Sequence, residues 1–162
     1  MEISIRQGRL EDAKQLADIE AICFPEAEAA SYEAIKARLE HFADCFFVAE
    51  FEGQSIGFIN GMVTDMEVIA DVLFEDASLH NEKGAWQSVF GLDVLPEYRN
   101  RGYAAALMER LIAKAREDGR AGCILTCKEQ LIHYYSGFGY VNKGLSKSQH
   151  GGAVWYDMVL EV

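Results

Sequence analysis

The chain has 162 residues, of which half are hydrophobic and a quarter are charged, the balance of a soluble globular protein. This length fits a single domain over residues 1–162 and is too short for two domains of ordinary size. Lys and Arg total 15 against 26 Asp and Glu, so the formal net charge is -11 at pH 7. A chain this acidic repels nucleic acids and attracts cations, which disfavours a nucleic-acid partner.

The sequence also disfavours a membrane protein. No stretch approaches the roughly 18 to 20 apolar residues that span a bilayer, and the first residues lack the apolar core of a secretion signal. We therefore expect a cytoplasmic protein.

The four cysteines form no CxxC pair and have no histidine cluster beside them, so we expect reduced thiols and no bound metal. The oligomeric state is not fixed by the sequence, and a homodimer stays open.

The N-terminal half predicts a strand, two helices and a β-hairpin. The segment EISIR alternates apolar and polar residues as a strand does, and residues 13–19 follow at helical spacing. A second helix is predicted over 31–42, beginning at the N-cap residue Ser31. Residues 45–63 contain two strand-like runs around a turn at Gly53, which is the usual signal of a hairpin.

The C-terminal half predicts strands that alternate with helices. Residues 64–84 are polar and acidic, and they predict a long loop with one short helix. The run WQSVFGLDVL predicts one strand, which a break and an amphipathic helix over 104–115 follow. A buried strand, a helical turn and a closing strand complete the chain. The fold class expected is α+β, with a mixed central sheet of about seven strands and helices on both faces.

The loop that enters the amphipathic helix carries the clearest chemical signal. Arg99 and Arg101 flank the start of this helix in an otherwise acidic protein. First-turn N–H groups have no intrahelical partner and the helix dipole is positive there, so the backbone itself stabilises an anion. Gly102 has no side chain to block close approach, and Ala104 keeps the surface small. We predict an anion site here, with solvated arginines that bind no ligand as the alternative.

The same stretch resembles the GNAT superfamily of N-acetyltransferases, because it fits the signature Arg/Gln-x-x-Gly-x-Gly/Ala. The preceding pattern L-x-V-x-P-x-Y-R over 92–99 also fits, as does Y-x-x-x-G-F/Y over 135–140. Within the superfamily the chain looks most like the arylalkylamine N-acetyltransferases, through LTCKEQLIHYYSGFGY and the loop FPEAEAAS.

The resemblance implies a GNAT fold, acetyl-CoA as the donor and a small primary amine as the acceptor, attacked directly in a ternary complex. Arylalkylamines are the class of amine that it suggests. It implies that the backbone of Leu92, Asp93 and Val94 bonds the pantetheine arm of the cofactor. By the same match the pyrophosphate would be held by Arg99, Asn100, Arg101, Gly102, Tyr103 and Ala104.

The resemblance also suggests catalytic and substrate-binding positions. Tyr135 matches the tyrosine that faces the thioester sulfur, so we expect it to protonate the departing thiolate. The animal arylalkylamine enzymes carry two histidines on the strand before the phosphate loop, and here Ser88 and Phe90 take their places. The candidate catalytic residues are thus Tyr135 and Ser88. The candidate substrate-binding residues are Phe24, Pro25, Glu26 and Phe90.

No general base is apparent in the sequence. An aliphatic amine with a pKa near 10.4 is neutral in about one molecule in 2,500 at pH 7, a deficit of roughly 4.6 kcal/mol. Glu26, Glu28, Asp65 and Glu67 could end a water chain that removes the proton, or they could simply attract the cation. The four histidines are more typical of surface or packed residues than of a base. A polyamine or peptide acceptor and a non-catalytic CoA-sensing domain are the alternatives.

Overall fold

The computed structural model, which describes residues 3–162, contains nine strands in two sheets. The first sheet has the order β1-β2-β3-β6, formed by β1 Ile3–Gln7, β2 Phe46–Phe51, β3 Gln54–Asn60 and β6 Gly91–Val94. The second has the order β4-β5-β7-β9-β8, formed by β4 Val63–Thr64, β5 Trp86–Val89, β7 Gly122–Cys127, β9 Tyr156–Glu161 and β8 Val141–Leu145. The pair β5–β7 is parallel, and the other pairs are antiparallel.

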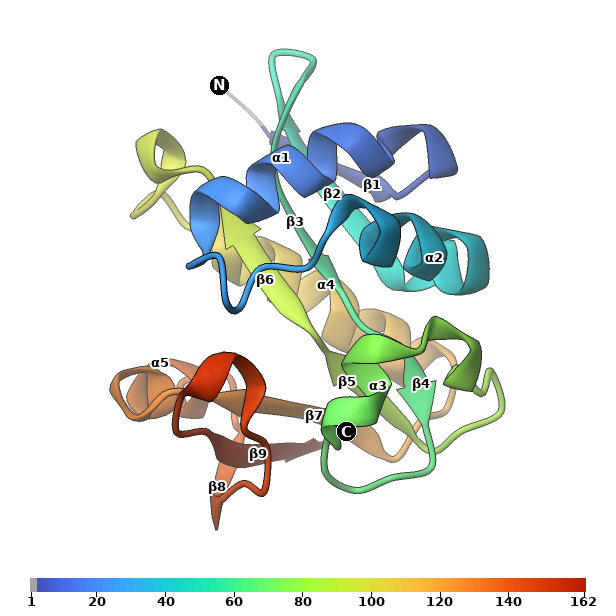
Figure 1. Cartoon of the computed structure of the whole chain (residues 1–162), viewed down its shortest axis with the longest axis vertical. Coiled ribbons are helices and arrows are strands. Elements are labelled where there is room, and N and C mark those ends of the chain that lie inside the picture. Colours follow the sequence, from blue (N-terminus) through green and yellow to red (C-terminus); the bar gives the residue numbers. More distant parts are fainter. Residues whose placement is uncertain (1–2) are drawn as a thin grey trace.

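Helices cover both faces of the first sheet (Figure 1). The helices α1 Ala13–Cys23 and α2 Tyr32–Phe42 lie on one face, and α4 Tyr103–Glu117 lies on the other. The short helices α3 Asp71–Glu75 and α5 Ile132–Ser136 flank the second sheet. The sequence determines these elements locally, since Ser31 caps α2 by accepting the Ala34 N–H at 3.1 Å. The apolar stripe of α4 is buried, and it consists of Leu107, Met108, Leu111, Ile112 and Ala115.

The chain passes from one sheet to the other at Phe90. Strand β5 pairs with β7, whereas β6 turns away and pairs with β3, and the Phe90 N–H donates to the Asn60 carbonyl at 2.7 Å. Strands β6 and β7 therefore diverge (Figure 1). Within residues 3–162 no strand pairs with the outer edge of β6. This divergence opens the molecule beside the start of α4.

The expected α+β class with helices on both faces of a sheet is confirmed, as is the hairpin of β2 and β3 around Gly53. Two details differ from the sequence prediction of about seven strands. The single strand expected over WQSVFGLDVL is two strands, β5 and β6, that belong to different sheets. Strand β8 was not predicted, because its sequence VNKGL lies on an exposed edge and has no apolar alternation.

Two apolar clusters fill the two sides of the first sheet. One lies under α4 and includes Met108 and Leu111, and the other lies under α1 and α2 and includes Leu16 and Phe46. In the part of the chain described, no helix is long and apolar enough to cross a membrane.

Candidate active site

A groove of about 550 Å³ lies where the free edge of β6 meets the start of α4. The side chain of Arg99 is fixed in its wall, because the Arg99 Nε donates to the Val94 carbonyl at 2.9 Å. The backbone of Gly102 has a φ of 85°, a left-handed conformation that glycine adopts without strain, and it caps α4. The unpaired N–H groups of the first turn of α4 thus lie beside an arginine, an arrangement that stabilises an anion.

Most of the predicted anion-binding residues line this groove. They are Arg99, Asn100, Gly102, Tyr103 and Ala104. Arg101 does not line it: the side chain is exposed, and its guanidinium lies over the Tyr98 ring at 5.6 Å. Of the strand residues, Leu92 and Val94 line the groove, whereas the fully buried Asp93 is not among its lining residues.

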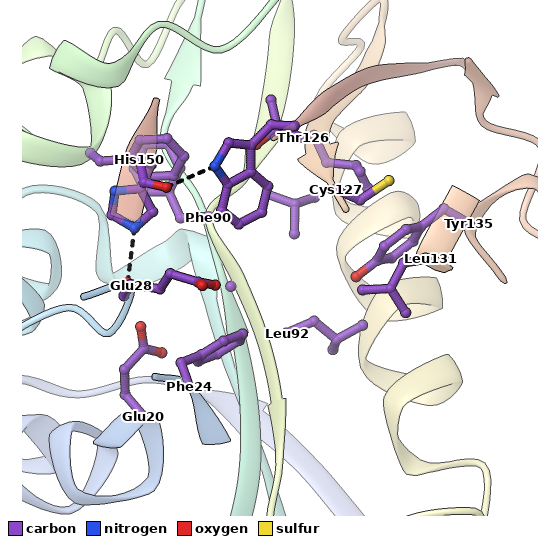
Figure 2. A pocket seen from close by; sticks show the side chains of 15 residues that line it. Glu20, Phe24, Glu28, Phe90, Leu92, Thr126, Cys127, Leu131, Tyr135 and His150 are labelled. Carbon is purple, nitrogen blue, oxygen red and sulfur yellow. Dashed lines mark hydrogen bonds between the residues drawn. The ribbon is translucent and has the colours of Figure 1, made fainter. Parts of the chain in front are cut away.

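A smaller cavity of about 140 Å³ adjoins the groove and is shown in Figure 2. Four side chains line both spaces, namely Phe24, Leu92, Leu131 and Tyr135. The other walls are largely aromatic and acidic, and they include Glu20, Glu28, Phe74, Phe90, Thr126, His150 and Trp155. The groove and the cavity therefore meet at these four side chains, of which Tyr135 alone carries a hydroxyl.

Tyr135 lies on α5, and its hydroxyl points into the cavity (Figure 2). Burial raises the pKa of Tyr135 well above its ordinary value, and the nearby Cys127 thiol adds to this effect. The phenol is therefore protonated at neutral pH and can donate a hydrogen bond at the junction of the groove and the cavity.

Segments far apart in sequence close one side of the cavity. The His150 Nε2 donates to the Glu28 carbonyl at 2.8 Å, and the Trp155 Nε1 donates to the His150 carbonyl at 2.8 Å (Figure 2). The His150 ring stacks on Phe74 of α3 with centroids 5.0 Å apart. We call these four residues, Glu28, Phe74, His150 and Trp155, the roof of the cavity.

Asp71 of α3 holds the segment before His150. Its carboxylate accepts the Ser148 hydroxyl, and it also accepts the Gln149 N–H at 3.0 Å. The roof is thereby tied to the segment between β4 and β5.

The two glutamates of the cavity have different partners. Glu28 pairs with Lys128, with Oε2 and Nζ 2.8 Å apart. Glu20 projects from α1 and is 6 % exposed, and its Oε2 accepts the Ala30 N–H at 2.9 Å. Behind Glu20 lies Asp93, which is fully buried. Burial raises the pKa of Asp93 well above its ordinary value, and the neighbouring Glu20 raises it further.

The structure brings some of the predicted residues together and leaves others apart. Phe24, Phe90 and Tyr135 line the cavity, but Pro25 and Glu26 are exposed and line neither space. Ser88 is fully buried and donates its hydroxyl to the Met62 carbonyl at 2.7 Å, so it reaches neither space. The acids proposed after the hairpin, Asp65 and Glu67, are exposed and also lie outside both spaces.

Sequence reasoning missed Glu20, Phe74 and Trp155, and it treated His150 as a surface or packed residue. The sequence spacing in α1 could have identified Glu20 as a candidate site residue. Glu20 follows Leu16 by four residues and therefore places a carboxylate on the apolar face of α1. No local pattern identifies His150, since long-range folding brings it to Glu28.

The family model described as "Acetyltransferase (GNAT) family" matches residues 13–140 of the chain. A curated relative, "Probable hydrolase YhcX" of Bacillus subtilis (strain 168), is 28% identical over 139 residues, which are 82% of this chain. The chain spans 27% of the length of that relative.

Two solved structures have the same fold. The "GphF GNAT-like decarboxylase in complex with isobutyryl-CoA" has a TM-score of 0.83 at 20% identity, covering 98% of each chain. The "ribosomal-protein-S18-alanine N-acetyltransferase from Escherichia coli" has a TM-score of 0.75 at 17% identity, covering 99% of this chain and 94% of that one. None of these similarities points specifically to the arylalkylamine branch.

Proposed function

Because the chain belongs to the acetyltransferase (GNAT) family, we propose that it transfers an acetyl group from acetyl-CoA to a small primary amine. One observation carries this proposal: an anion-stabilising groove and an acid-lined aromatic cavity meet at the hydroxyl of Tyr135. Such a pair of spaces provides one site for a large anionic donor and one for a small cationic acceptor.

The groove has the features that acetyl-CoA requires. Arg99 and the first turn of α4 can hold the pyrophosphate. The outer edge of β6 is free of a strand partner among the described residues, so backbone groups at Leu92 can bond the amides of the pantetheine arm. The similar fold of a GNAT-like decarboxylase that binds isobutyryl-CoA supports an acyl-CoA ligand. When bound, acetyl-CoA would supply a thioester carbonyl for attack.

The cavity favours a small ammonium ion. Glu20 provides a negative carboxylate, whereas the charge of Glu28 is paired with Lys128. The aromatic rings of Phe24, Phe90 and Trp155 provide faces for an aryl group, and Arg38 and Lys128 already lie over Phe90 and Trp155. A volume of about 140 Å³ suits a small molecule better than an extended chain. The roof, which includes Phe74 from the 64–84 segment, covers the space that an extended peptide would need.

The proposed reaction is a direct attack by the neutral amine on the thioester. Two reactants held side by side need no covalent acetyl-enzyme, since positioning makes the attack effectively intramolecular. Tyr135 is placed to donate a hydrogen bond to the sulfur as the thiolate departs. Burial disfavours the phenolate and a thiolate in the same cavity alike, so the raised pKa of Tyr135 does not by itself prevent this donation.

The test is release of the CoA thiol from acetyl-CoA with a panel of acceptors. We expect phenethylamine, tryptamine or a similar small primary amine to be turned over with a higher kcat/KM than polyamines and peptides with free N-termini. A tenfold advantage for polyamines or peptides would replace the small-amine proposal with that alternative. Stabilisation by acetyl-CoA without thiol release from any acceptor would instead identify a CoA-sensing domain.

A further inference from the structure

A polar space lies over Gly91, one of the residues that line the acceptor cavity. The position that a Cβ would take on Gly91 is 3.1 Å from the Asp93 Oδ1, 3.6 Å from the Asn60 Nδ2 and 3.6 Å from the Glu20 Oε1. Gly91 and Glu20 both line the cavity, so this space opens toward the acceptor. We call it the Gly91 cradle.

The cradle is built from buried polar groups that lack partners. Asp93 is 0 % exposed and Asn60 is 1 % exposed. Neither carboxyl oxygen of Asp93 nor the Asn60 Nδ2 has a hydrogen-bond partner among the described residues. Buried polar groups are nearly always satisfied, and a water or a ligand nitrogen needs two to four such partners. The cradle therefore suits an ammonium group or a water that bridges it to Glu20.

We propose that Glu20 is the catalytic base that takes the proton from the acceptor ammonium, and that Asp93 is a positioning residue that holds Glu20 for this step. This inference rests on the proposed acetyl transfer and adds the base that the sequence did not reveal. Ser88, which lies at the position of a histidine in the animal arylalkylamine enzymes, is turned to the Met62 carbonyl and offers no alternative.

The contacts separate Glu20 from the other candidates. Glu28 is paired with Lys128, and the His150 Nε2 is engaged by the Glu28 carbonyl. Glu20 has one backbone partner on Oε2, while its Oε1 faces the cradle. The charged and titratable groups around Glu20, taken over all elements packed against it, are Cys23, Glu28, Arg38, Glu75, Asp93 and His150.

Asp93 supports this role as a neutral acid. Two adjacent buried carboxyl groups do not both ionise readily, and burial together with the neighbouring Glu20 raises the pKa of Asp93 well above its ordinary value. A protonated Asp93 can donate to the Glu20 carboxylate and keep it oriented toward the cradle. The buried guanidinium of Arg38, also 6 % exposed, balances the remaining negative charge.

The proposed step moves two protons from the nitrogen and breaks one carbon–sulfur bond. The ammonium gives one proton to Glu20, and the resulting amine nitrogen bonds to the acetyl carbon. The carbon–sulfur bond then breaks, and its electron pair leaves on the CoA sulfur. As the amide forms, the second nitrogen proton passes to Tyr135 while Tyr135 gives its own hydroxyl proton to the sulfur, so the phenol ends the step protonated. Glu20 returns its proton to solvent through a third cavity, of about 140 Å³, that Glu20, Arg38 and Glu75 line.

The first experiment compares Glu20→Gln with Glu40→Gln, an exposed glutamate on α2 outside all three cavities. We expect Glu20→Gln to lower kcat/KM at pH 7 by about 10² to 10⁴, with stabilisation by acetyl-CoA unchanged. Its rate should rise about tenfold per pH unit toward the pKa of the amine, because neutral amine must come from solution. Glu40→Gln should behave like the wild type. If Glu20→Gln keeps more than a third of the wild-type kcat/KM at pH 7, the assignment of Glu20 as the catalytic base is overturned.

The second experiment tests the positioning role through a conservative variant. Asp93→Asn keeps an N–H donor toward Glu20 and should retain kcat within about fivefold. Asp93→Leu, or Asp93→Ala if the leucine variant does not fold, should lose about ten- to a hundredfold in kcat with unchanged acetyl-CoA affinity. Equal kcat values in the folded variants would mean that Asp93 is only structural.

Gly91→Ala tests the cradle directly. Gly91 does not have a positive φ, so its backbone conformation permits alanine, and the added methyl group would fill the cradle and crowd the Asp93 Oδ1 at 3.1 Å. We expect a loss of at least tenfold in kcat/KM with acetyl-CoA binding intact. Wild-type turnover in this variant would refute the proposal that the acceptor ammonium or a bridging water occupies the cradle. A wild-type protein that turns over no amine overturns the proposed function together with this base, whereas active Glu20→Gln overturns the base alone.

Discussion

The hydroxyl of Tyr135 is a single hydrogen-bond donor on a side chain that lines both the groove and the cavity. Tyr135→Phe keeps the ring that packs α5 and removes this donor. We expect kcat to fall by about 10² to 10⁴ while acetyl-CoA affinity changes little. Tyr156→Phe is the control, because the Tyr156 hydroxyl contacts Glu129 outside both spaces. If Tyr135→Phe keeps more than a third of wild-type kcat with chemistry rate-limiting, water or another group protonates the sulfur.

The buried carboxyl of Asp93 makes folding stability depend on pH. Its pKa is raised in the folded state, so the folded protein binds more protons than the unfolded chain between pH about 4 and the folded pKa. The contribution of protonated Asp93 to the free energy of unfolding is complete below this pH range and falls as the pH rises through it. Asp93→Asn should remove this fall, so its stability relative to the wild type should grow by about 1.4 kcal/mol for each pH unit between pH about 4 and the folded pKa of Asp93.

Urea unfolding at several pH values measures this effect. Asp18→Asn, which changes an exposed carboxylate on the same helix as Glu20, is the control. A pH dependence that is identical in Asp93→Asn and the wild type would show that Asp93 is ionised in the folded protein.

Two glycines with positive φ lie at the opposite ends of α4. Gly102 lies at the groove and has a φ of 85°, whereas Gly119 follows the C-terminal end of α4 and has a φ of 72°. A Cβ atom added to either glycine would have no neighbouring atom within 4 Å. Valine at each position therefore introduces similar backbone strain. We expect Gly102→Val to abolish thermal stabilisation by acetyl-CoA, because its side chain enters the pyrophosphate site. Gly119→Val should keep it, and equal ligand responses in the two variants would refute the assignment of the groove.

The sequence predicts elements well where one local rule decides them. Ser31, the apolar stripe of α4 and the turn at Gly53 each specify their structure within a few residues. The break at Phe90 was not predictable, because the apolar run WQSVFGLDVL reads as one strand whichever sheet each half joins. The anion site followed from a motif, whereas the cavity depends on contacts such as that of His150 with Glu28, 122 positions apart.

The roof joins parts of the chain that lie far apart in the sequence. Asp71 is the carboxylate that ties α3 to the segment before His150. Asp71→Ala should raise the KM for the amine by about tenfold, because a loosened roof holds the acceptor less well. The free energy of unfolding should fall by about 1 to 3 kcal/mol, since a half-buried hydrogen bond from the Ser148 hydroxyl and an exposed one from the Gln149 N–H are lost.

Asp76→Ala is the matched control for this substitution. Among residues 3–162, Asp76 accepts side-chain hydrogen bonds only from Ser78, two positions along the chain, so the variant removes a local cap and no contact of the roof. Amine kinetics and denaturant unfolding measure both effects. Equal KM values in the two aspartate variants would show that the roof does not contribute to acceptor binding.

The divergence of β6 from β7 also affects how the protein behaves before it meets its donor. A strand edge without a partner is a template on which another chain can add a strand, and such edges promote aggregation. When acetyl-CoA binds along β6, the backbone groups that bind it are no longer free to pair with a strand of another chain. The ligand-free protein should therefore self-associate faster on mild heating than the protein saturated with acetyl-CoA, at equal fractions unfolded. Light scattering measures this, and the same backbone edge would then set both the donor site and the colloidal stability of the free chain.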